Sequence, residues 1–184
     1  MTYNAPIREI SFALEQFADT PLLASLPGFE EATPDMIDAI LEEAAKLARD
    51  VIAPLNQVGD TQGSTLENGV VRTPEGFADC WRQFVEGGWA SIPFPPEYGG
   101  QGLPMALSMA AFEIWTAANM SFGLCPMLNQ GAIEAIKRHG TDEQKSIYLE
   151  KMIAGEWVGT MNLTEPNAGS DLGVLRCRAT LQKD

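Results

Sequence analysis

The residues best suited to hold a ligand lie in one short stretch near the carboxyl end, residues 159–173. Thr164 and Ser170 supply hydroxyl groups, and Gly169 lets a ligand approach the main chain closely. Pro166 removes a backbone donor and biases the residue before it toward an extended conformation. A strand that ends in such a turn suits a flat polar heterocycle or a phosphate. From these residue types alone, a surface hairpin loop is the structural alternative.

This stretch resembles the flavin-binding signature Leu-Thr-Glu-Pro-x-Ala-Gly-Ser-Asp of the acyl-CoA dehydrogenase family. Three further motifs stand in that family's order. Residues 96–102 are similar to its Pro-x-x-x-Gly-Gly-x-Gly loop, residues 140–149 to its Gly-Thr-x-Glu-Gln-Lys helix, and residues 155–156 precede the signature at the usual distance. Asn162 and Val174 depart from the pattern, because the family has small residues there. Both flank the core of the signature and therefore concern fine contacts.

The resemblance implies FAD as cofactor and names the residues that bind it. Met161, Leu163 and Thr164 would face the flavin, with main-chain donors and the Thr164 hydroxyl bonded to its pyrimidine edge. Gly169 and Ser170 would approach the pyrophosphate, and Ser170 would also touch the CoA part of the substrate.

The activity that the resemblance implies is α,β-dehydrogenation of an acyl-CoA thioester. FAD would accept the hydride, and an electron-transferring flavoprotein would be the partner that takes the electrons. The family's catalytic base is a glutamate in a C-terminal helical bundle that these 184 residues do not reach, so we assign no catalytic residue. Glu165 precedes a proline in a tight turn, which favours a structural role. We therefore expect an N-terminal portion of a flavoenzyme, inactive alone.

The first 75 residues indicate a subgroup within this family. Patterns such as Leu-Pro-Gly-Phe-Glu-Glu-Ala-Thr-Pro at 26–34 are not general to the family and are similar to a long bacterial subgroup. Candidate substrates are therefore 3-methylmercaptopropionyl-CoA and fatty acyl-CoA. Two alternatives remain: an FAD-dependent acyl-CoA oxidase, and an inactive helical interaction module without bound flavin.

Composition limits the partners and the compartment. The net charge of −13 lacks the basic footprint that nucleic-acid phosphates require. The sequence shows neither a secretory signal nor an apolar run long enough to cross a bilayer. Three widely spaced cysteines make no metal or disulfide pattern, which predicts reduced thiols and a cytoplasmic location. We also expect a homo-oligomer and no metal site.

Helices must position the ligand-binding stretch. Apolar residues at helical spacing predict six of them, over 3–19, 34–53, 74–86, 105–122, 126–138 and 142–154. Thr33 is predicted to cap the second helix, and Thr141 with Gln144 forms a capping box for the last one. We expect Trp115 and Phe112 to be buried, because residues 105–122 have no polar face. Residues 56–73 and 93–104 are predicted loops, the first with a short hairpin at Gly69.

The periodicity changes after residue 155. Residues 157–163 and 175–181 are predicted strands, and two strands rarely make a stable unit alone. The predicted fold is thus mainly α: a helical domain over 1–155, with residues 1–33 as a subgroup-specific extension. Residues 156–184 would be the first strands of an incomplete β domain.

Overall fold

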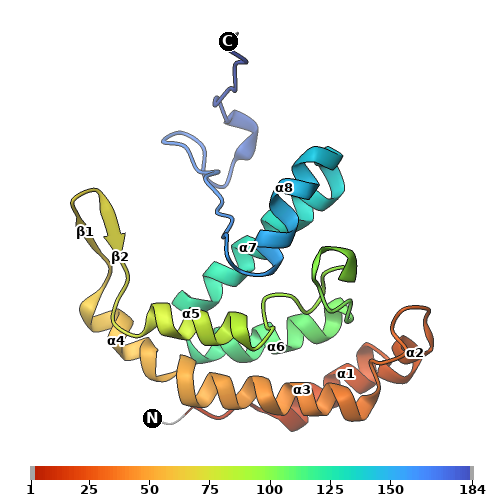
Figure 1. Ribbon diagram of the computed structural model, residues 1–184. Coiled ribbons are helices and arrows are strands. Elements are labelled where there is room, and N and C mark those ends of the chain that lie inside the picture. Colours follow the sequence, from red (N-terminus) through yellow and green to blue (C-terminus); the bar gives the residue numbers. More distant parts are fainter. Residues whose placement is uncertain (1–2, 183–184) are drawn as a thin grey trace.

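The computed structural model describes residues 3–182 and is mostly helical, as predicted (Figure 1). The helices and strands over these residues are α1 (Ile7–Phe17), α2 (Thr20–Ser25), α3 (Pro34–Leu47), α4 (Pro54–Gln62), β1 (Thr65–Glu67), β2 (Val70–Arg72), α5 (Phe77–Glu86), α6 (Met105–Ala118), α7 (Met120–His139) and α8 (Asp142–Ile153). Single turns of 3₁₀-helix lie at Pro96–Tyr98 and Leu172–Val174, and a π-helical turn lies at Ala48–Ile52. No helix among the described residues is long and apolar enough to cross a membrane.

The main core lies where α6 packs against α3 and α5. Trp115 of α6 is buried, with its ring edge-on to Phe84 of α5 at 4.8 Å between centroids and to Trp89 at 5.4 Å. Edge-to-face pairs of this kind stabilise a core beyond their buried area. The prediction for Trp115 is confirmed, whereas Phe112 is only half-buried. It packs against the main core and also lines a groove between α1 and α6.

Local capping explains where several helices begin and end. The Thr33 hydroxyl accepts from Met36 N at 3.3 Å, as predicted, with Pro34 in the first turn of α3. The predicted capping box of α8 is present in both directions, between Thr141 and Gln144. Gly155 follows α8 with φ +73°, a conformation that glycine adopts without strain.

Pro54 does not end a helix, which corrects the sequence prediction. The π-helical turn at Ala48–Ile52 lies directly before it, where Ala53 N donates to Ala48 O at 2.8 Å. Pro54 then occupies the first turn of α4, the place where a missing N–H costs least. The predicted loop at 56–73 is thus helical over residues 56–62. Its apolar content is low, and indeed α4 has no buried residue.

A β-hairpin follows α4, as predicted. β1 and β2 pair antiparallel, with Leu66 opposite Val71, and Asn68 and Gly69 form the turn at φ +52° and +79°. Two consecutive positive φ angles are typical of the turn that suits the twist of a hairpin, and Asn-Gly is its preferred pair. The hairpin projects from the helices, and its strand residues are exposed (Figure 1).

The boundary between α6 and α7 differs from the prediction. The break falls at Asn119, whose side chain accepts from Phe122 N at 3.2 Å and so caps α7. Pro126 lies inside α7 and does not begin a helix there. The earlier start follows from the asparagine cap, which supplies the acceptor that the first turn of α7 needs.

The glycine-rich loop before α6 folds back tightly on itself. Gly102 N donates to Phe94 O at 2.8 Å, and Gly100 N donates to Pro95 O at 3.0 Å. A Cβ on Gly100 would overlap the carbonyl group of Phe94. The motif therefore requires glycine at position 100 for close approach of two backbone segments.

The predicted strands at 157–163 and 175–181 are absent. Both segments run extended without a pairing partner among the described residues, and residues 159–164 and 175–182 are mostly exposed. A strand is defined by its ladder of inter-strand hydrogen bonds, so an alternating pattern alone cannot form one.

Candidate functional site

The ligand-binding stretch leaves the helices after α8 and runs away from them (Figure 1). All five residues predicted to bind the cofactor are exposed, including Met161 at 63% and Leu163 at 39%. Three of them precede a turn at residues 165–168, and the other two directly follow it. These five residues are therefore accessible, whereas Ala168 between them is buried.

A tight turn organises the centre of this segment. Glu165 N donates to Ala168 O at 2.9 Å, and Ala168 N returns a bond to Glu165 O at 3.1 Å. The Glu165 carboxylate accepts from Arg176 N at 2.9 Å and from Cys177 N at 2.7 Å. Bonds from backbone N–H groups to a carboxylate are among the stronger protein hydrogen bonds. Glu165 thus ties the two arms of the segment together, which agrees with the structural role predicted for it.

A second small turn follows at Asp171. Its Oδ1 accepts from Gly173 N at 3.0 Å and introduces the 3₁₀ turn Leu172–Val174. Between the two turns, the N–H groups of Gly169 and Ser170 donate to no described residue, and neither does that of Thr164 before them. Space is also open where a Cβ on Gly169 would lie. The segment therefore presents main-chain donors and a hydroxyl, a donor set that suits a flavin edge and an anionic pyrophosphate.

The start of the segment is held firmly against the helices. Trp81 Nε1 of α5 donates to Gly155 O at 3.2 Å. The Trp157 ring contacts Tyr148 at 5.9 Å between centroids, and Lys151 Nζ lies 4.3 Å from its centre. Gly159 N donates to the Asn129 side chain of α7 at 2.9 Å. These contacts place the beginning of the stretch beside α7 and α8.

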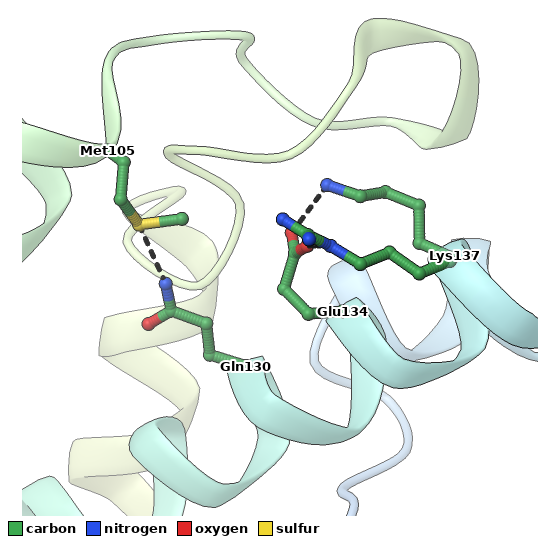
Figure 2. A network of polar contacts seen from close by, with 5 residues as sticks. Met105, Gln130, Glu134 and Lys137 are labelled. Atoms are coloured by element: carbon green, nitrogen blue, oxygen red, sulfur yellow. Dashed lines mark hydrogen bonds and ion pairs between the residues drawn. The ribbon is translucent and has the colours of Figure 1, made fainter.

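Sequence reasoning did not identify Asn129. An isolated asparagine within an apolar helix has no periodicity or motif that indicates a contact with a segment 30 residues away. Other polar residues of α7 are partly buried and do not contact the segment: Gln130 contacts Met105 Sδ, and Lys137 pairs with Glu134 (Figure 2).

A largely apolar pocket of about 480 Å³ lies near the start of the segment, with Val158 in its lining. Phe77 and Trp81 of α5 and Cys125 of α7 form part of its wall. Burial raises the pKa of the Cys125 thiol, and burial raises the pKa of Cys80 in the core to about 11. Both thiols are therefore weak nucleophiles at neutral pH. None of the five predicted binding residues lines the pocket.

The helical part of the chain is similar to a known protein family. A family model described as acyl-CoA dehydrogenase, N-terminal domain, matches residues 34–156. The whole chain aligns with the 3-methylmercaptopropionyl-CoA dehydrogenase of Ruegeria pomeroyi at 50% sequence identity. The aligned region covers 31% of that protein's length.

Two solved structures have a similar fold. One chain, in a structure described as the electron transferring flavoprotein of Acidaminococcus fermentans, has a TM-score of 0.63 and 29% identity over 75% of this chain and 34% of that one. Butyryl-CoA dehydrogenase from Megasphaera elsdenii has a TM-score of 0.60 and 22% identity over the same shares. The chain spans about a third of the length of the relatives it matches.

Proposed function

The chain belongs to the acyl-CoA dehydrogenase family, and from this premise we propose that it is the N-terminal part of an FAD-dependent enzyme that dehydrogenates acyl-CoA thioesters. The observation that supports this most directly is the exposed turn at 163–171, which carries the signature and presents its unpaired donors outward. The 50% identity to a 3-methylmercaptopropionyl-CoA dehydrogenase favours that thioester, or a fatty acyl-CoA, as substrate.

We propose roles for the segment's residues in binding FAD. Met161, Leu163 and Thr164 hold the flavin, with the Thr164 hydroxyl and neighbouring main-chain N–H groups as donors to its polar edge. Gly169 and Ser170 lie against the pyrophosphate, and Ser170 also contacts the CoA part of the substrate. Bound FAD would supply the acceptor for the substrate's hydride. Preorganised donors at the flavin edge stabilise the negative charge that grows there on reduction.

We also propose how the chain is divided into domains and which partners the protein has. Residues 1–155 form the helical domain, with 1–33 as the extension, and residues 156–184 begin a β domain. An electron-transferring flavoprotein takes the electrons, a partner supported by the solved structure of that description. We also propose a homo-oligomer in the cytoplasm, in keeping with the free thiols of Cys80, Cys125 and Cys177.

The test is a visible spectrum and turnover of the complete protein with acyl-CoA. We expect a flavin band near full occupancy and reduction of an artificial electron acceptor without matching oxygen uptake. Stoichiometric oxygen uptake would identify an oxidase instead. A complete protein without a flavin band would support the interaction-module alternative.

Substitutions in the turn separate ligand contacts from folding. Gly169→Val adds a side chain into open space, so we expect folding to be unchanged. The added bulk would keep FAD from the main chain, and FAD affinity should fall more than tenfold. Thr164→Val removes one neutral hydrogen bond, worth about 1 kcal/mol, and should weaken FAD only several-fold.

These effects are measured by flavin fluorescence titration of the complete protein, with circular dichroism as the check on folding. Equal FAD affinity in Gly169→Val and the unaltered protein would remove Gly169 from the binding site.

A further inference from the structure

One buried polar side chain joins the cofactor-binding segment to the helices. Asn129 lies in the middle of α7 and is only 3% exposed. Its Nδ2 donates to Met152 O in the last turn of α8 at 3.0 Å, and its Oδ1 accepts from Gly159 N at 2.9 Å. Both ends of the amide are therefore used, and each bonds a main-chain group on a different element.

The shape of this contact is as specific as its hydrogen bonds. A Cβ on Gly159 would overlap the Ala132 methyl group and would lie 3.0 Å from Met152 Cε. The main chain at Gly159 thus packs directly on α7, one turn from Asn129. Only glycine allows the backbone to come close enough for the Asn129 bond.

Beyond Gly159 the segment has no comparable attachment. Its hydrogen bonds are internal, between Glu165 and Ala168, between Glu165 and residues 176–177, and between Asp171 and Gly173. None of the described residues of the helices bonds to residues 160–182. After the bond from Trp81 to Gly155 and the packing of Trp157, the Asn129–Gly159 bond is thus the last hydrogen bond between the described helices and the segment before the signature.

We propose that Asn129 is a positioning residue for FAD: it fixes the start of segment 159–173 on α7 and α8, so that the segment's main-chain donors are ordered before FAD binds. This inference rests on the proposed function of that segment. A binding site that is ordered in advance spends less of its interaction free energy on ordering. Without the Asn129 contact, the free energy of FAD binding must also supply the cost of ordering the segment.

The experiment uses the complete protein with FAD and the variant Asn129→Leu, which keeps a similar volume but makes neither bond. We expect FAD to bind at least about tenfold more weakly, a factor that corresponds to about 1.4 kcal/mol. The visible flavin band of the loaded variant should also shift, because the donors around the flavin are displaced. Asn129→Asp retains the acceptor for Gly159 N and should recover part of the affinity.

Two controls separate positioning from general stability. Gln130→Leu alters the next residue of α7, whose amide bonds Met105 Sδ at 3.1 Å and not the segment (Figure 2). Leu41→Ala removes a buried side chain of α3, away from the Asn129–Gly159 contact. It lowers stability by leaving a cavity in the core. Both variants should bind FAD within about twofold of the unaltered protein at a temperature where they are folded.

A second pair of variants decides the matter if Asn129→Leu fails to fold. Gly159→Ala should weaken FAD binding by displacing the segment, and adding Ala132→Gly should restore much of it by making room for the new methyl group. Equal affinity in all of these variants would overturn the inference.

Failure of the proposed function and failure of the positioning role give different results. An unaltered complete protein that binds no FAD refutes the proposed function. An unaltered protein that binds FAD, together with an Asn129→Leu variant of equal affinity and equal spectrum, overturns the positioning role alone.

Discussion

Gly100→Ala is expected to lower the free energy of unfolding by about 3 kcal/mol or more, since the added methyl group has no place to go. The atoms it would overlap belong to the carbonyl of Phe94, which is backbone and cannot turn aside. Phe94 itself is buried, and its carbonyl accepts from Gly102 N. Relief of the overlap would thus disrupt a hydrogen bond and shift a core residue. Urea denaturation of the purified chain gives the measurement.

A matched glycine in the same chain provides the control. Gly131 lies inside α7, and a Cβ there would meet no atom within 4 Å. Because glycine is a poor helix former, Gly131→Ala should raise stability by about 0.5–1 kcal/mol. Similar changes in stability for the two substitutions would show that the loop at 93–104 does not pack as described.

Trp115→Ala should cost roughly 3–5 kcal/mol, the range for removing a large buried aromatic side chain. The ring is 3% exposed and makes edge-on contacts with Phe84 and Trp89, so its loss would leave a cavity and break two aromatic pairs. Chemical denaturation followed by circular dichroism tests this without relying on the fluorescence of the residue removed.

Trp157→Ala is the comparison at an exposed position. Trp157 is 41% exposed, and its ring packs on Tyr148 and Lys151 at the surface. Its loss should cost about 1 kcal/mol or less. A Trp115 variant as stable as the Trp157 variant would contradict the placement of α6 at the centre of the core.

Local signals predicted the helices well where apolar periodicity and caps agreed. Thr33, Thr141 and Gly155 lie at the ends of their helices as expected, because each acts through neighbours within a few residues. Pro54 and Pro126 misled the prediction. Proline normally interrupts a helix. Pro54, however, follows a π-helical turn directly and occupies the first turn of the next helix, and Pro126 lies inside a helix that has already begun after Asn119.

The proposed site rests on a local sequence motif, whereas its attachment to the helices was not predicted. Thr164, Gly169 and Ser170 stand in a local motif whose residue types identify it. Asn129 and Gly159 are brought together by the packing of α7 and α8, which no short-range pattern encodes. The predicted strands failed for the same reason, since alternation at 175–181 indicates a strand only where a second strand is available to pair with it.

The π-helical turn at Ala48–Ile52 determines how far the following helix is rotated about the helix axis. Each residue of an α-helix turns the chain by about 100°, and a π-helical turn holds one residue more than an α-helical one. A regular helix through the same sequence would rotate α4 and the hairpin about the helix axis by that angle. The hairpin therefore points where it does because of a single extra residue in the turn that precedes Pro54. Insertion or deletion of one residue at this place would redirect the hairpin without altering any residue within it.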